Sequence, residues 1–243
     1  MSHIQKAFLI AFIVGILESA AVTPAFSYVT GGAPWPGSPI TIKYSYVNMF
    51  DGSILMPNNT PLPNSVIKGS IEEALKLWTT VVPINFVEVP NGSASQLRFS
   101  HIYINGPDPA PPADPIAKAQ STCIGYSSVC DVQYDDSDRW QVVGTQPIPD
   151  ILGASVHEIG HVLGLNHTDV VGADMYWIFN RFSGPGTATL QPDDIAGIQS
   201  IYGAGTGSLS PLAVPEPTAC FLGLAAVGWF LTNRPARGKR AAS

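Results

Sequence analysis

The chain has 243 residues, of which 45% are hydrophobic and 12% are charged, and its formal net charge is −6. This length fits one domain of moderate size with appendages, because about 200 residues suffice to bury a full core. Within residues 28–217, 17 acidic residues outnumber 7 basic ones, which gives a net charge of −10. The domain is therefore a poor candidate for nucleic-acid binding, since phosphate contacts need clustered lysine and arginine.

Residues 1–27 have the pattern of a secretory signal peptide. Lys6 precedes the apolar run 7–17, and small residues follow it. We expect cleavage between Ala20 and Tyr28. A membrane anchor is the alternative, but the run is shorter than the roughly 20 apolar residues that a spanning helix needs.

Residues 28–203 form the predicted central domain. Apolar and polar residues alternate in its expected strands, and apolar residues recur at helical spacing in its expected helices. The pattern indicates a mixed sheet packed against a helix, with Asn64 or Ser65 as a helix N-cap. Strands are predicted at 38–47, 83–89, 95–104 and 127–134, the last at an edge, and helices at 64–81, 149–165 and 191–203.

Two cysteines lie close together in this domain. Cys123 and Cys130 could form a disulfide in an oxidising compartment, which agrees with export. Two free buried thiols are the alternative. The third cysteine, Cys220, falls in the C-terminal tail and has no nearby partner in the sequence.

The segment 157–167 reads HEIGHVLGLNH and holds three of the chain's five histidines. In a helix, His157 and His161 lie on one face, so both could bind one metal ion. Glu158 is rotated by about 100° from His157, which leaves it outside the ligand set but within reach of water at the metal.

His167 can join the other two histidines only if the chain turns back after the helix. Gly164 lies where this turn is needed, because glycine adopts positive φ angles without steric strain. The alternative is a buried apolar helix that happens to carry histidines. The full pattern H-E-x-x-H-x-x-G-x-x-H is specific, however, and predicts a zinc site with three histidine ligands.

Together with this motif, three further stretches resemble the matrixins, the metzincin family that includes the matrix metalloproteinases. They are 71–89, the sequence ADMY at 173–176, and DDIAGIQSIYG at 193–203, and the resemblance covers about 35–203. It implies an α+β metzincin fold with a mixed, mostly parallel twisted sheet, an active-site helix and a C-terminal helix. It also implies that Met175 forms a structural floor beneath the zinc.

The resemblance implies a zinc-dependent endopeptidase that cleaves protein or peptide substrates. Glu158 would be the general base that activates water at the zinc. The substrate would lie extended along an edge strand near 128–132, and residues 177–190 would shape the specificity pocket. A catalytically weak zinc-binding protein and a structural protein of the cell surface or extracellular matrix remain alternatives.

The sequence departs from the family at its other metal sites. Gln133 stands where the family has a histidine ligand of a structural zinc, and His101 is the only other histidine in the domain, so one zinc is expected. Asp135 and Asp138 keep the acidic spacing of the family's calcium site and could bind Ca²⁺ through oxygen ligands. A solvated acidic loop is an equal alternative.

The tail at 214–243 resembles the PEP-CTERM sorting signal of Gram-negative bacteria. It has VPEP at 214–217, an apolar stretch at 219–231 and then four basic residues. The resemblance implies processing by an exosortase-type enzyme, transient membrane contact and an extracellular or cell-surface location. A buried C-terminal helix is the alternative. Residues 204–213 are rich in glycine and serine and are predicted to be a flexible linker.

Overall fold

The structure, a computed structural model, describes residues 26–106, 119–141, 150–178 and 186–212. Residues 1–25 of the expected signal peptide (1–27) and all of the expected sorting tail (214–243) lie outside these residues. Among the described residues, no helix is both long and apolar enough to cross a bilayer.

A six-stranded sheet forms the centre of the domain, in the order β5-β6-β4-β2-β3-β8. Every neighbouring pair is parallel except β5 and β6, which confirms the expected mixed, mostly parallel sheet. The strands are β2 (Ile40–Tyr46), β3 (Ile84–Glu88), β4 (Leu97–Ile102), β5 (Ala119–Ser121), β6 (Cys130–Asp135) and β8 (Ser208–Ser210).

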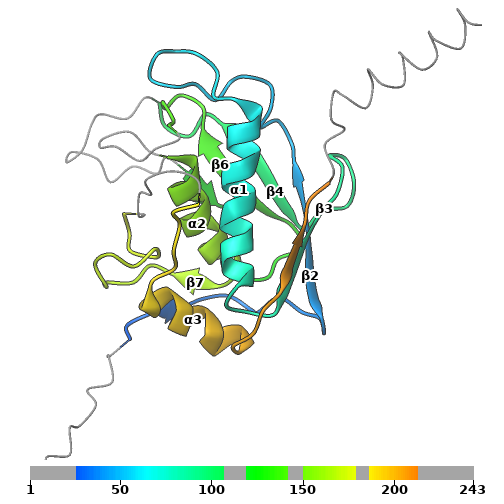
Figure 1. Cartoon of the computed structure of the whole chain (residues 1–243), viewed down its shortest axis with the longest axis vertical. Coiled ribbons are helices and arrows are strands. Elements are labelled where there is room, and N and C mark those ends of the chain that lie inside the picture. Colours follow the sequence, from blue (N-terminus) through cyan, green and yellow to red (C-terminus); the bar gives the residue numbers. More distant parts are fainter. Residues whose placement is uncertain (1–25, 107–118, 142–149, 179–185, 213–243) are drawn as a thin grey trace, which may run out of the picture.

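Three helices accompany the sheet: α1 (Asn64–Thr79), α2 (Ile151–Val162) and α3 (Pro192–Tyr202). Figure 1 shows α1 crossing the sheet with α2 beside it, and the two helices pack against each other as well as against strands. A separate antiparallel pair joins β1 (Val29–Thr30) to β7 (Leu165–Asn166), close to α3. This α+β arrangement is the predicted fold class.

Helix α1 buries one apolar face, and its N-cap lies one residue before Asn64, the first of the two expected caps. Its N-cap is Pro63, which makes no side-chain capping hydrogen bond. The prediction of Asn64 or Ser65 as the cap was therefore wrong, because the Asn64 side chain donates to the Phe50 carbonyl instead. The buried face holds Ile67, Ile71, Ala74, Leu75 and Trp78.

The sheet edge next to α2 is β5, and not the strand predicted at 127–134. That strand is β6, which pairs with β4 on one side and with β5 on the other. The edge expected near 128–132 was therefore wrong. Strand β5 has three residues, too few for an alternating pattern to be recognised in the sequence.

The opposite edge is β8, which lies inside the segment 204–213 that we expected to be a flexible linker. It pairs with β3 in parallel, so this part of the segment is docked on the sheet. A Cβ atom at Gly207 would lie 1.7 Å from the Ile84 carbonyl oxygen. Here glycine permits close packing of two backbones, which composition alone does not distinguish from flexibility.

Trp78 connects the two central helices. It is completely buried, and its indole N–H donates to the Val156 carbonyl of α2 at 3.1 Å. The position that a Cβ atom would take on Gly160 is 3.1 Å from the Trp78 ring. Trp78 therefore fixes the distance between α1 and the helix that carries the HExxH residues.

We expect Trp78→Ala to lower the free energy of unfolding by about 3–5 kcal/mol, because it leaves a cavity between α1 and α2. Urea denaturation measures the change. Tyr103, which is 68% exposed, provides the control, since Tyr103→Ala should stay within about 0.5 kcal/mol of the wild type. Equal effects of the two substitutions would contradict the role given to Trp78.

Candidate metal centre

Three histidine rings meet at the C-terminal half of α2. The Nε2 atoms of His157 and His161 are 3.2 Å apart, and that of His167 lies 3.1 Å from the first and 3.2 Å from the second. Within the described parts of the chain, these histidines make the only group of three side chains that could hold a metal ion. The structure thus brings together the three ligands expected from the motif.

The other ring nitrogens fix the tautomers of two of these histidines. The Nδ1 atom of His157 lies 2.7 Å from the Asp174 carbonyl oxygen, and that of His161 lies 2.8 Å from the Leu165 carbonyl oxygen. A carbonyl only accepts, so Nδ1 donates in both cases and Nε2 keeps its lone pair. The lone pairs of the cluster therefore point toward one another.

The environment also keeps the rings neutral. Burial lowers the pKa of His157 to about 3 and that of His161 to about 4, and it lowers the pKa of His167 as well. Neutral imidazole is the form that binds metal. Tetrahedral ligands about 2.0–2.1 Å from zinc lie about 3.3–3.4 Å apart. The observed Nε2 separations are close to this spacing, so the residues fit a zinc ion.

Two local features of the chain build this arrangement. Asp150 caps α2, and its carboxylate accepts a hydrogen bond from the Gly153 N–H at 2.6 Å. The helix ends where Gly164 takes a φ of 103°, in the left-handed region that favours glycine. The chain then turns back through β7 and brings His167 to the helix, as the sequence predicted.

A second turn, at 173–176, lies against α2. A Cβ atom at Gly160 would be 2.3 Å from the Met175 sulfur, so the methionine packs directly on the helix, one residue from His161. The Asp194 carboxylate in α3 accepts from the backbone N–H groups of Asp174 and Met175, at 2.7 and 2.9 Å. Asp194 thus fixes the turn whose carbonyl orients His157.

The sequence did not single out Asp194. Acidic residues in the first turn of a helix are common, because they interact favourably with the helix dipole. Asp193 and Asp194 both fit this ordinary explanation. Only the fold reveals that Asp194 is 1% exposed and that its burial raises its pKa.

Glu158 lies beside the histidine cluster and is 6% exposed. Burial raises the pKa of its carboxyl group to about 7, although the polar groups of Ser121 act in the opposite direction. Ser121 is the last residue of β5. Because the sequence did not predict β5, it gave no reason to name Ser121.

His101 lies outside this cluster. Its Nδ1 atom is 2.9 Å from an Asp136 carboxylate oxygen, and its Nε2 atom is 3.0 Å from one of Asp51. Its backbone N–H donates to the Asn48 side chain. Both ring nitrogens therefore join surrounding loops to β4.

The acidic segment after β6 forms a tight turn. The Asp135 carboxylate accepts from the backbone N–H groups of Asn105 and Ser137, at 3.1 and 2.9 Å. Asp135 is fully buried and Asp138 is 4% exposed. The structure thus brings both expected calcium ligands into one loop and leaves them well shielded from water.

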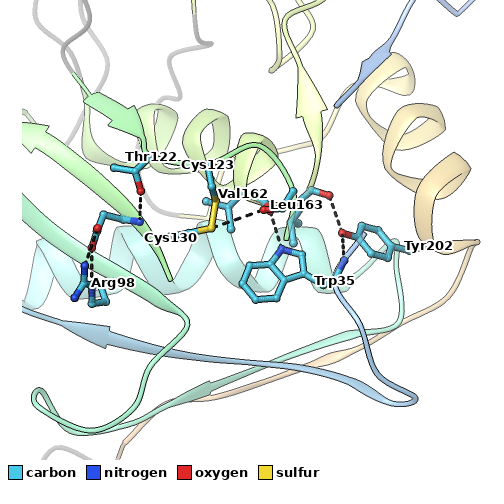
Figure 2. The surroundings of a disulfide bond; sticks show 10 residues. Trp35, Arg98, Thr122, Cys123, Cys130, Val162, Leu163 and Tyr202 are labelled. Atoms are coloured by element: carbon cyan, nitrogen blue, oxygen red, sulfur yellow. Dashed lines mark hydrogen bonds and ion pairs between the residues drawn. A yellow bond between two sulfur atoms is a disulfide. The ribbon is translucent and has the colours of Figure 1, made fainter. Parts of the chain in front are cut away.

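Cys123 and Cys130 are joined by a disulfide, drawn in Figure 2. The bond closes the loop between β5 and β6. Within this loop, the Gly125 N–H donates to the carbonyl oxygen of His161 at 2.9 Å. The disulfide loop therefore contacts the end of the helix that carries the histidines.

Known proteins are similar to this chain in sequence. Residues 53–203 match the sequence profile of the family described as Matrixin. Mouse (Mus musculus) stromelysin-1 is 32% identical over 196 residues, which is 78% of this chain and 37% of that protein. Rabbit (Oryctolagus cuniculus) interstitial collagenase is 32% identical over 169 residues, 67% of this chain and 34% of that protein.

The chain thus spans a little over a third of the length of these relatives. The profile match extends from the loop before α1 to the end of α3, and it includes the histidine cluster, Glu158 and the turn that holds Met175. The mostly parallel sheet and the position of α2 agree with it. This chain belongs to the matrixin family.

Proposed function

We propose that the chain is an exported, zinc-dependent endopeptidase. The observation that carries this proposal is the convergence of three neutral Nε2 atoms, from His157, His161 and His167, beside the buried Glu158. Membership of the matrixin family supports zinc as the metal and peptide bonds as the target. Gly164 and Met175 support the site structurally, through the turn after α2 and the packing on Gly160.

The three histidines hold the metal. When bound there, zinc supplies a Lewis acid that polarises a peptide carbonyl and makes water more acidic. The hydrogen bonds from Nδ1 of His157 and His161 to backbone carbonyls keep the rings in the orientation that binding requires.

Glu158 moves the proton. Its carboxylate takes a proton from the attacking water and passes it to the nitrogen of the leaving amine, as a general base and then a general acid. Its position supports this role, since it follows a ligand directly in α2 and lies against the β5 edge. The peptide bond is thereby hydrolysed to a carboxylate and an amine.

The substrate in this proposal is a protein or peptide segment bound in extended form. Strand β5 is the edge of the sheet nearest to α2, so an extended segment can pair with its backbone. Such pairing gives affinity through main-chain hydrogen bonds, and side-chain pockets give selectivity. Residues 177–190 were expected to shape the main pocket, and 179–185 lie outside the described residues.

Export is the second part of the proposal. Residues 1–27 would be removed as a signal peptide, and an exosortase-type enzyme would process the PEP-CTERM tail at 214–243. The tail would contact the membrane transiently, and the mature protein would be extracellular or attached to the surface of a Gram-negative bacterium. The Cys123–Cys130 disulfide supports an oxidising destination.

We expect about one tightly bound zinc per chain, and we expect His161→Ala to lose it, because two histidines no longer complete the site. Elemental analysis of the purified protein measures the content. His101→Ala is the matched control and should keep the zinc, since His101 bridges two aspartates away from the cluster. A purely structural protein would contain no stoichiometric zinc, and two zinc ions per chain would redirect attention to His101.

We expect Glu158→Gln to retain zinc while hydrolysis falls by about 10²- to 10⁴-fold, because glutamine keeps the shape but is not a base. His157→Ala should lose metal and activity together. Peptide cleavage rates and zinc content, measured on the same preparations, separate the two kinds of failure. The catalytic assignment would be falsified if Glu158→Gln turned over at a near-normal rate with full zinc. A zinc-loaded wild type that cleaves no peptide would favour the catalytically weak alternative.

Calcium binding by Asp135 and Asp138 is a separate proposal. Its support is that two carboxylates three positions apart are both buried, so that a cation between them would offset the cost of removing two like charges from water. If the loop binds Ca²⁺, millimolar calcium should raise the melting temperature, since a hundredfold excess over Kd stabilises the native state by about 2.7 kcal/mol. Asp138→Asn should weaken this response. An unchanged melting curve would mean that the loop is stable without the ion.

A further inference from the structure

Strand β5 is supported by one neighbouring strand only. Among the described residues it pairs with β6 on one side and has no strand on its other side, which is the side that the proposed substrate would use. The pairing joins Ala119–Ser121 to residues 132–134, and one side-chain hydrogen bond runs from Gln120 to Gln133 at 2.8 Å. A short strand with few backbone hydrogen bonds belongs to the least stable parts of a fold. The position of β5 therefore depends on whatever else closes it onto β6.

Strand β6 is itself firmly held. It pairs with β4 along its whole length, residues 130–135. Arg98 of β4 also makes two hydrogen bonds to the Asp131 carboxylate, Nε to Oδ1 at 2.6 Å and Nη2 to Oδ2 at 2.8 Å. A bidentate pair of this kind fixes orientation as well as distance. Strand β6 is thus a rigid support, and its connection to β5 decides where β5 lies.

The disulfide between Cys123 and Cys130 makes this connection just beyond β5 (Figure 2). It holds Cys123, two residues after β5 ends, at a Cα–Cα distance of 5.5 Å from the first residue of β6. Next to it, the Thr122 N–H donates to the Asp131 carbonyl at 2.9 Å, and the Asp131 N–H donates to the Thr122 hydroxyl at 2.8 Å. The covalent bond therefore closes the hairpin at the end of a three-residue strand.

The remaining backbone contacts of the loop lead away from this hairpin. The Gly125 N–H donates to the His161 carbonyl, and the Tyr126 N–H donates to the Ala33 carbonyl. Both donors follow Cys123 in the chain, so they fix the tip of the loop and do not join β5 to β6. Without the disulfide, only the short pairing and its adjacent hydrogen bonds would hold β5.

The metal cluster does not depend on the hairpin in the same way. The rings of His157 and His161 are oriented by the carbonyls of Asp174 and Leu165, which lie after α2 and outside the hairpin. Opening the disulfide therefore removes a restraint from β5 and leaves the hydrogen bonds of these rings in place. Peptide binding and zinc binding should respond differently to the state of this bond.

The two cysteines differ in their access to solvent. Cys130 is completely buried, whereas Cys123 is only partly buried. A dithiol reductant can therefore attack the Cys123 sulfur, which forms a mixed disulfide and releases the Cys130 thiolate. The second thiol of the reductant then releases Cys123. The protein gains two electrons and two protons, and the reductant becomes a disulfide.

We propose that the Cys123–Cys130 disulfide is a redox switch for peptide binding: the closed bond holds β5 where it can pair with a substrate, and reduction releases β5 and weakens that binding. The inference rests on the proposed function, because it concerns the strand along which the peptide would lie. In a reducing compartment the chain would hold zinc but bind peptide poorly. Export to an oxidising compartment would close the bond and complete the peptide site.

The test compares three states of the zinc-loaded full chain: the oxidised wild type, the wild type reduced with a water-soluble phosphine, and Cys123→Ala combined with Cys130→Ala. The phosphine takes oxygen from water and becomes a phosphine oxide while two thiols form, and it avoids added thiols, which are themselves zinc ligands. Cys220→Ser, which removes the chain's third cysteine, is the matched control. Free thiols, zinc content, kcat and KM on a peptide substrate are measured for each.

We expect reduction and the double cysteine variant each to raise KM about tenfold, because only molecules with β5 in place bind peptide. A disulfide across a loop this short restricts the open chain by roughly tenfold or more. Zinc content and kcat should stay within about twofold of the oxidised wild type, the pattern of lost binding without lost chemistry. Cys220→Ser should behave as the wild type. An unchanged KM in the fully reduced protein overturns the proposal.

Hydrogen exchange tests the structural half of the proposal without any peptide. After reduction, the amides of residues 119–122 should exchange at least about tenfold faster, while those of β4 keep their protection. A disulfide that merely stabilises the whole domain would lower the melting temperature and speed exchange in both strands alike. That result overturns the switch, as does a bond that the phosphine fails to reduce in the folded protein. If the double cysteine variant does not fold, the reduced wild type still decides.

Failure of this inference is distinct from failure of the proposed function. If the oxidised wild type cleaves peptide and Glu158→Gln does not, but reduction changes neither KM nor exchange, the endopeptidase stands and the switch falls. If the oxidised, zinc-loaded wild type cleaves nothing, both fall together.

Discussion

Imidazole lone pairs that point at one another repel unless a cation lies between them, so the protein must hold the histidines of the cluster against this repulsion while the metal is absent. Hydrogen bonds on the far side of two rings do this, through the carbonyls of Asp174 and Leu165. Both carbonyls belong to segments that follow α2 in the chain, Leu165 to β7 and Asp174 to the 173–176 turn. The metal site therefore depends on backbone orientation in these segments as much as on the spacing of His157 and His161 in the helix.

Distant parts of the chain hold these two segments in place. Asp194 in α3 accepts from the backbone on both sides of the Asp174 carbonyl, and β1 pairs with β7 next to His167. The closing helix and the N-terminal strand, which come from opposite ends of the domain's sequence, thus act together beside the metal site. A buried carboxylate that takes two backbone donors is a rigid connection, because losing it would leave both N–H groups unsatisfied.

Features created by interactions between residues close in sequence could be predicted, and features created by contacts between distant residues could not. The helix with its i, i+4 histidines, the turn at Gly164 and the long strands depend on local periodicity, and each was predicted within a few residues. Strands β5 and β8 have three residues each and are stabilised by pairing with distant strands. The contacts of Asp194 with the 173–176 turn exist only after the chain has folded, so no local pattern marks them.

Two glycines, Gly160 and Gly207, have a packing role that the sequence did not indicate. At Gly160 a side chain would collide with Met175, and at Gly207 with the Ile84 carbonyl. In sequence, the first looks like an unfavourable residue within a helix and the second like part of a linker. Both allow close packing, one of the turn on α2 and the other of β8 on the sheet. Glycine near a metal motif therefore indicates backbone approach as readily as flexibility, and only the identity of the opposing atom distinguishes the two.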